Sequence, residues 1–180
     1  MAAAARRAAE SCASAPFAAL GEHHLSRALF TVGRYEESAA ASERVLALAR
    51  SSGNVLVESA SLMNLALCTR EDGSPTARQR WRATLAHVAG LRNWQNTWIL
   101  LEALAADWAE RGMVDQAAII AAHLHRHGAA SPSLRERRER LEEILAARGV
   151  GGEVRPPSTV LDRDAVVAFA LRWLAGGEDR

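Results

Sequence analysis

Apolar and small residues recur every three to four positions along most of the chain, which is the spacing of one face of an α-helix. This period predicts helices at about 17–32, 35–51, 55–71, 76–90, 94–111, 114–128, 132–148 and 161–175. No segment shows the strict alternation of apolar and polar residues that marks a half-buried strand. The pattern therefore predicts an all-α fold.

A glycine separates two helical patterns at three places, Gly33, Gly73 and Gly112, which lie forty and then thirty-nine residues apart. A near-constant period of this length is typical of stacked helix pairs. Small residues flank the first and third glycines where two helices must approach closely, and this arrangement resembles the tetratricopeptide pattern. We therefore expect a tetratricopeptide-like superhelix of about three antiparallel helix pairs, with one or two capping helices at its C-terminal end.

The domain organisation follows from these segments and from the composition of their connections. Glycines and prolines between residues 149 and 158 predict a linker. The final helix should fold back and cover the open end of the array, because a terminal repeat must hide its apolar face. The expected parts are an alanine-rich N-terminal helix or tail at 1–16, a helical repeat domain at 17–148 (repeats at about 17–53, 55–91 and 94–128, plus a helix at 132–148), the linker at 149–158 and a C-terminal helix within 159–180.

The charge balance excludes several classes of partner. The chain has 22 basic and 21 acidic residues, and every basic residue is an arginine. No excess of one charge is present to attract nucleic acid or anionic lipid, so we expect neither as a direct partner. The charged run from Arg135 to Glu143 should neutralise itself through pairs four residues apart, such as Arg138 with Glu142.

The sequence also lacks the residue patterns of catalysis and cofactor binding. Without lysine there is no phosphate-loop lysine and no Schiff-base lysine. Cys12 and Cys68 lie far apart, and His123 and His127 share a helix face with no third ligand at metal-binding spacing. We expect no enzyme activity, no cofactor and no metal. Since no secretion signal or membrane span is evident, we also expect a cytoplasmic protein.

A partner-binding groove is expected on the concave face of the superhelix, which the first helix of each pair lines. Its mainly apolar character with a few charged side chains suits an amphipathic helix or tail of a partner protein. A small-molecule inducer is the alternative ligand, and simple packing against neighbouring turns is the alternative without a ligand. The groove residues are His23, Arg27, Phe30, Met63, Leu67, Arg70, Ile99 and Glu102.

Trp94, Trp98 and Trp108 recur at helical spacing and form one aromatic stripe, which Trp81 of the preceding helix should face. Core packing is the favoured interpretation, because a buried indole contributes several kcal/mol. The alternative is a platform on which a sugar or a nucleobase stacks, with Asn93, Gln95 and Asn96 nearby to supply amide hydrogen bonds.

The segment from Arg78 to Leu174 carries further features in a characteristic order. They are Arg80-Trp81, Arg92-Asn-Trp94, Leu104-Ala105, Gly112 and Leu161-Asp-Arg-Asp164. This segment is similar to the helical C-terminal region of the large ATP-dependent LuxR-type regulators and related signalling ATPases of actinobacteria. The resemblance implies a region that holds a partner or an inducer against a nucleotide-binding ATPase core. Neither ATPase nor DNA-binding activity is carried over, because no GxxxxGK[ST] loop occurs and the family's ATPase and helix-turn-helix parts would need sequence other than these residues. A piece of such a regulator and a stand-alone adaptor both remain open.

Overall fold

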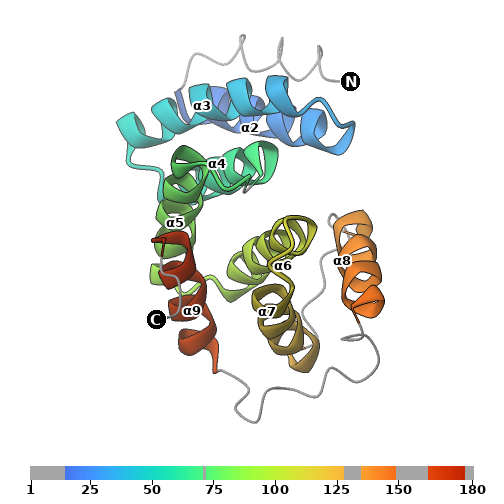
Figure 1. Cartoon of the computed structure of the whole chain (residues 1–180). Coiled ribbons are helices and arrows are strands. Elements are labelled where there is room, and N and C mark those ends of the chain that lie inside the picture. Colours follow the sequence, from blue (N-terminus) through green and yellow to red (C-terminus); the bar gives the residue numbers. More distant parts are fainter. Residues whose placement is uncertain (1–14, 71, 128–134, 149–161, 177–180) are drawn as a thin grey trace. The chain divides into compact units, whose positions relative to one another are not determined.

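The structure, a computed structural model, describes residues 15–70, 72–127, 135–148 and 162–176. Within these residues the chain is all-α, and adjacent helices pack as pairs in a tetratricopeptide-like fold, as predicted. Each helix end lies within three residues of its predicted position. The predicted tail up to residue 14 and the predicted linker at 149–158 lie outside the described residues. The helices are α2 (Ala15–Thr31), α3 (Tyr35–Ser52), α4 (Val55–Thr69), α5 (Pro75–Gly90), α6 (Trp94–Glu110), α7 (Val114–Arg126), α8 (Arg135–Ala147) and α9 (Arg163–Leu174) (Figure 1).

Several of these helices end in the same tight turn. Gly33, Gly53 and Gly112 have φ angles of 78°, 66° and 84°, in the left-handed region that favours glycine. In each turn the N–H groups of the glycine and of the next residue donate to carbonyls three and five residues earlier, at 2.9–3.3 Å. These bonds form a Schellman motif, which satisfies the last carbonyls of the helix. Arg92, with a φ of 53°, takes the same backbone conformation between α5 and α6.

The chain forms two compact units, Met1–Thr69 and Arg70–Arg180. Helices α2 to α4 belong to the first unit and α5 to α9 to the second. The boundary falls inside the predicted repeat at 55–91, so the two helices of that repeat belong to different units. The predicted repeat domain at 17–148 is thus divided at the turn-rich segment before α5, where the Ser74 hydroxyl caps the new helix by accepting from Ala77 N at 3.1 Å.

In the first unit α3 packs against both α2 and α4. Its inner face carries small apolar residues that are fully buried, and their size lets the helices approach closely. The buried residues on this face include Ala41, Val45 and Ala49. A helix pair extended by a third helix is therefore the architecture of this unit.

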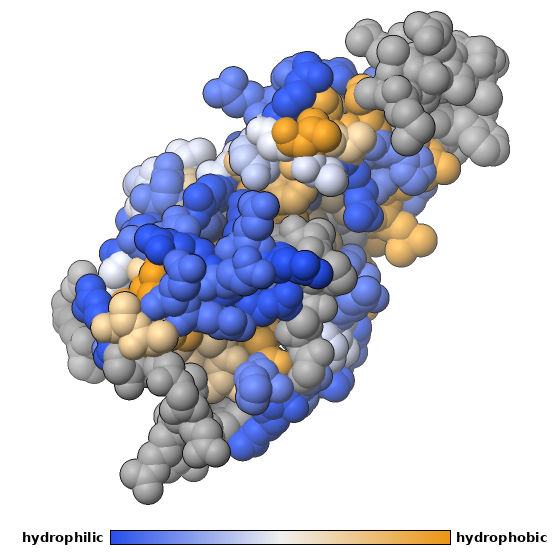
Figure 2. All heavy atoms as spheres, turned by 90° about the vertical axis from the view of Figure 1, so that its right-hand side faces the viewer, coloured by the Kyte–Doolittle hydropathy of each residue, from blue (hydrophilic) through white to orange (hydrophobic). Residues whose placement is uncertain are grey.

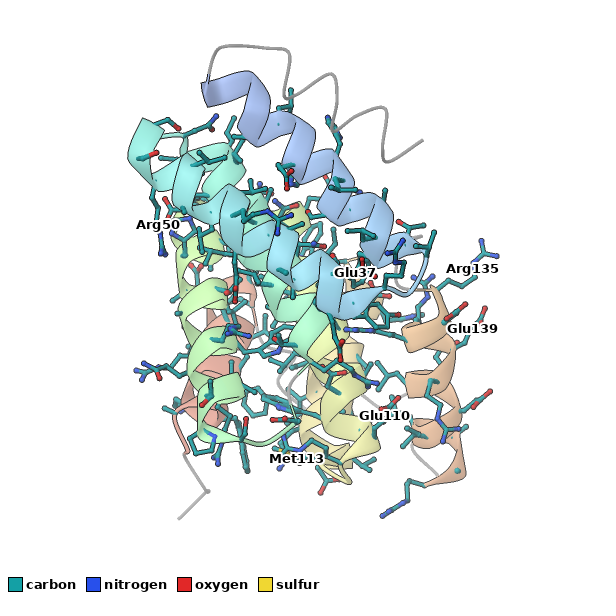
Figure 3. The ribbon with its side chains drawn as sticks, turned by 90° about the horizontal axis from the view of Figure 1, so that it is seen from above. Glu37, Arg50, Glu110, Met113, Arg135 and Glu139 are labelled. Carbon is teal, nitrogen blue, oxygen red and sulfur yellow. The ribbon has the colours of Figure 1, made fainter. Side chains whose placement is uncertain are left out.

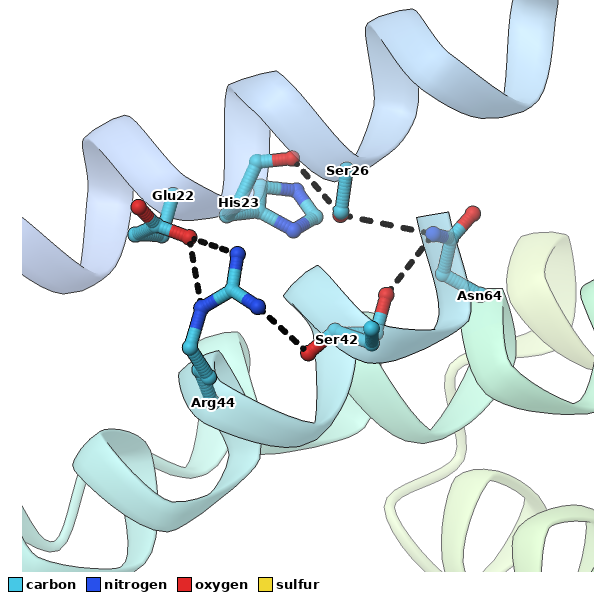
Figure 4. Close-up of polar contacts among 7 residues, drawn as sticks. Glu22, His23, Ser26, Ser42, Arg44 and Asn64 are labelled. Atoms are coloured by element: carbon cyan, nitrogen blue, oxygen red, sulfur yellow. Dashed lines mark hydrogen bonds and ion pairs between the residues drawn. The ribbon is translucent and has the colours of Figure 1, made fainter. Parts of the chain in front are cut away.

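A buried polar network joins these three helices. The side-chain amide of Asn64 in α4 donates to the hydroxyl of Ser42 in α3 at 2.8 Å and to that of Ser26 in α2 at 3.3 Å (Figure 4). It also donates to the hydroxyl of Ser38 in α3 at 2.8 Å. The three serines are fully buried and Asn64 is nearly so. Because a buried polar group needs a partner, the network favours one alignment of the helices over others.

In the second unit α6 is the central helix. Every residue from Leu100 to Ala109 is buried, as expected for a helix that is covered on all sides. Helices α5, α7 and α8 pack against α6, and α9 packs against α5 (Figure 1). None of the described helices combines the length and the apolar character that crossing a bilayer requires.

Candidate functional site

The predicted groove residues are divided between the two units. His23, Arg27, Phe30, Met63 and Leu67 belong to the first, and Arg70, Ile99 and Glu102 to the second. A groove that combines both sets stays a prediction.

In the first unit, Arg27 is the one member of this set that is exposed. His23 and Phe30 are half-buried, and the Phe30 ring meets Tyr35 edge-on with 5.4 Å between the ring centroids. Met63 and Leu67 are 8% and 7% exposed. Little of these two side chains is therefore open to a ligand, although the helical register placed them on the groove face.

His23 occupies an environment that disfavours its charged form. Burial lowers the pKa of His23 below its ordinary value, and the positive charges of Arg27 and His24 lower it further. The neighbouring Glu22 does not offset this, since its carboxylate accepts from the guanidinium of Arg44, at 2.9 Å from Nη2 (Figure 4). The surroundings of His23 therefore favour its neutral form.

Arg70 is not a free groove cation, because two carboxylates of α6 hold it. Its Nη2 lies 2.8 Å from Asp107 Oδ1 and 2.5 Å from Glu110 Oε2, and the Asp107 side chain is 1% exposed. Burial lowers the pKa of Arg70, but the two carboxylates more than offset that effect and raise the pKa overall. Arg70 has a φ of 53°, an unusual conformation for a residue with a side chain. The ion pairs of Arg70 with Asp107 and Glu110 therefore attach the start of the second unit to α6, its central helix.

Glu102 is likewise unavailable to a groove ligand. It is 3% exposed, and α8 packs over α6 with the guanidinium of Arg138 at 3.2 Å from Glu102 Oε1. The expected pair of Arg138 with Glu142 is thus replaced by a pair between two helices. Ile99, the remaining member of the predicted groove set, is half-buried.

The outer surface of α8 is hydrophilic. Arg135 and Glu139 project away from the helix (Figure 3), and Arg140 pairs with Glu143 at 3.0 Å. The view in Figure 2, onto the side where α8 lies in Figure 1, is dominated by hydrophilic residues. This face is therefore suited to solvent, but the pair within the run joins residues three apart and not four as predicted.

The four tryptophans of the aromatic stripe divide into two pairs. Trp81 and Trp108 are 0% and 1% exposed and belong to the core of the second unit. Trp94 and Trp98 are half-buried in the first turns of α6, which Asn93 starts by accepting from Asn96 N at 3.2 Å. This capping role occupies the side-chain oxygen of Asn93, one of the three amide side chains that the sugar-platform alternative named.

Two other side chains of this unit contact the Trp98 ring. The guanidinium carbon of Arg163, the first residue of α9, lies 5.2 Å from the Trp98 ring centroid and 5.5 Å from that of Trp94. On Trp98, the His127 ring also stacks nearly parallel, at 6.1 Å and 16° between the planes. These distances fit a cation–π contact that attaches α9 to α6. The structure therefore leaves little open ring surface on Trp98 for a sugar or a base.

Helix α9 docks through a continuous apolar face. Asp162 starts the helix by accepting from Ala165 N at 2.7 Å, which places Arg163 in the first turn. The Phe169 ring meets Trp108 edge-on at 6.4 Å. The residues of α9 that become buried are Val166, Val167, Phe169, Ala170 and Leu174. Nothing local in the sequence indicated the partner of Arg163, because about sixty-five residues separate it from Trp98.

The histidine pair of α7 has no metal-binding set around it. The ring centroids of His123 and His127 are 4.5 Å apart. Among residues 15–70, 72–127, 135–148 and 162–176, no group of three or more potential ligands is placed to hold a metal ion. The most organised feature of the second unit is therefore the surface of α5 and α6 that receives α9.

No family model, curated protein or solved structure matches this chain.

Proposed function

We propose that this chain is a non-catalytic, tetratricopeptide-like interaction module that binds an amphipathic helix of a partner protein. The observation that carries the proposal is the docking of α9 in the second unit. Helix α8 ends at Ala147 and α9 begins at Arg163, so α9 reaches α5 across fifteen connecting residues and buries its apolar face there. A surface that holds this helix offers the apolar contacts that another amphipathic helix needs.

On this proposal the chain works in the cytoplasm as the C-terminal input region of a larger regulator. The support is the similarity of residues 78–174 to the helical region of the LuxR-type regulators and signalling ATPases. A stand-alone adaptor would bind a helix in the same way without passing the signal to an ATPase core. Where a nucleotide-binding core is encoded upstream in the same reading frame, the helix peptide should change the rate of ATP hydrolysis of the whole protein.

A small-molecule inducer is a less suitable ligand for the aromatic stripe. The two buried tryptophans are core residues, and Arg163 and His127 both contact the Trp98 ring. An inducer would have to displace both side chains before it could stack. A partner helix that displaced α9 could restore the same ring contacts with an arginine in the place of Arg163.

The proposal is tested by selecting helical peptides from a displayed library against the full chain. Selected peptides should carry an arginine followed by apolar residues three, four, seven and eleven positions later, the spacing of Arg163, Val166, Val167, Ala170 and Leu174. A parallel thermal-shift screen with metabolites provides the comparison. Selected peptides with no amphipathic helical spacing, or stabilisation by a metabolite and by no peptide, would overturn the proposal. A ligand at a hundredfold excess over its Kd stabilises the protein by about 2.7 kcal/mol.

A further inference from the structure

We infer that the face of α5 and α6 covered by α9 is the partner-binding surface of this chain, and that α9 is a removable occupant that the partner helix displaces. The inference rests on the proposed function, and it adds the place of binding and a built-in competitor. It also specifies the partner: an amphipathic helix with an arginine one turn before its apolar positions.

The N-terminal end of α9 supplies the polar part of this recognition. The Arg163 guanidinium lies against the rings of both Trp94 and Trp98, at 5.5 and 5.2 Å from their centroids, while Arg163 itself stays exposed. Two aromatic faces that meet one cation form a site with a preference for arginine, whose planar group stacks on rings. A partner helix can therefore be recognised by an arginine in the same position.

The rest of α9 supplies the apolar part. Phe169 meets Trp108 in the centre, and the guanidinium of Arg78, near the start of α5, lies beside Gly176 just after the end of α9. The two helices therefore run antiparallel. Arg78 is also favourably placed for the carbonyl end of whichever helix occupies the site, because that end carries partial negative charge.

The attachment of α9 differs in kind from that of α8. Helix α8 is held by the Arg138–Glu102 pair, with Glu102 buried in α6. In the part of the chain that the structure describes, α9 makes no ion pair with the rest of the second unit. Apolar packing and a cation–π contact can be reproduced by any helix of the same pattern. A helix held by these contacts alone is exchangeable without leaving a buried charge unpaired.

The covalent connection decides how strong a competitor α9 is. Fifteen residues join α8 to α9, and a short connection of this kind keeps a tethered segment at an effective concentration in the millimolar range. A partner helix in solution must compete with that concentration. Helix α9 therefore lowers the affinity of every partner helix for this surface by a constant factor. A variant in which α9 is loosened should bind the partner helix more tightly by the same factor.

The experiment measures binding of a fluorescein-labelled peptide of residues 161–176 to the full chain by fluorescence anisotropy. The test variant is Ala170→Asp, which places a carboxylate on the buried face of α9, and the matched control is Ala168→Asp on its exposed face. Ala170→Asp should bind the peptide at least about tenfold more tightly than wild type, because its own helix no longer competes. Ala168→Asp should behave like wild type. A peptide with Arg163→Ala should bind about two- to fivefold more weakly.

A second measurement decides the matter if Ala170→Asp no longer melts cooperatively. Hydrogen exchange of the wild-type chain should become faster in residues 165–174 when unlabelled peptide is added, and Arg163→Glu should make the same amides exchange faster without peptide.

Equal peptide affinity of wild type and a folded Ala170→Asp, or unchanged exchange, overturns the inference. A dimer of the wild type that forms with rising concentration and is lost in Ala170→Asp also overturns it, since the occupant would then be α9 of a second copy. Library peptides that bind without loosening α9 leave the proposed function standing and reject only this site.

Discussion

The side-chain amide nitrogen of Asn64 lies 2.8 Å from the hydroxyl of Ser42 on the neighbouring helix, and both groups are buried. The same amide also bonds Ser38 and Ser26, so one side chain satisfies hydroxyls from two helices. Asn64→Leu should lower the free energy of unfolding by about 2 kcal/mol, because it leaves buried hydroxyls without their donor. Urea denaturation followed by far-UV circular dichroism measures the change.

The control for this prediction removes the polar groups together. A variant with Ser38→Ala, Ser42→Ala and Asn64→Leu should recover much of the lost stability, since only the Ser26 hydroxyl, whose bond to Asn64 is the longest at 3.3 Å, then lacks this donor. If Asn64→Leu alone were as stable as wild type, the network would contribute nothing to the fold. If the effects of the three substitutions on the free energy of unfolding are not additive, the three side chains act as a polar network and do not merely pack.

The Arg138–Glu102 pair makes a prediction for the second unit. Arg138→Met should destabilise the protein by about 2–4 kcal/mol, because it removes a positive partner from a carboxylate buried in the central helix. Glu102→Gln in the same chain should restore part of the loss. Arg140→Met is the matched control on the same helix; its pair with Glu143 is exposed and should contribute less than about 0.5 kcal/mol. Equal effects of the two arginine substitutions would contradict this account.

The turn between α5 and α6 holds a residue with a side chain in a backbone conformation suited to glycine. Arg92→Gly should stabilise the second unit by about 0.5–1 kcal/mol, because Arg92 has a φ of 53°. Gly112→Ala is the mirror experiment and should destabilise by about 1 kcal/mol, since an added Cβ at Gly112 meets no other atom and the backbone strain acts alone. Thermal unfolding of both variants tests the pair. A loss of stability in Arg92→Gly would show that its side chain makes a contact worth more than the strain.

His23 should make the stability of the first unit depend on pH. Its pKa in the folded protein is lowered below 6.5, mainly by burial and then by Arg27, so the unfolded chain binds more protons as the pH falls below 6.5. The stability that His23 contributes is therefore complete above the unfolded pKa and is lost as the pH falls below it. Urea midpoints measured between pH 5 and pH 8 should decline on the acid side for wild type and decline less for His23→Gln. Arg27→Gln should reduce the decline part of the way, whereas an unchanged profile in both variants would assign the pH dependence to other groups.

The helices were predictable because their apolar period and their turns are local in the sequence. The glycines at 33 and 112 marked two turns directly, whereas the left-handed residue of the turn between α5 and α6 is Arg92, which the glycine pattern did not mark. The boundary between the two units was not visible, since the helical pattern continues on both sides of Arg70. Its signal was present only as the turn-rich segment from Asp72 to Pro75.

The candidate site was predicted less well, because its contacts join distant parts of the chain. The helical register placed Glu102 on an open face, and that inference assumed that no later helix would cover α6. Arg138 is a charged residue in a polar run, so nothing in its surroundings announced a buried carboxylate as its partner. The aromatic stripe was found from its spacing, but its division into core and surface depended on Arg163, which only the folded chain brings close.

The position of α9 in the sequence also has a consequence for synthesis on the ribosome. The helix that α9 covers is complete at residue 90, while α9 is complete only at residue 174. At roughly 5–20 residues per second, the 84 intervening residues take about 4–17 s to translate. During that interval the nascent chain presents the α5 surface without its own cap. A partner translated nearby, or a chaperone, would meet this surface at the one stage when it has no competitor from the same polypeptide.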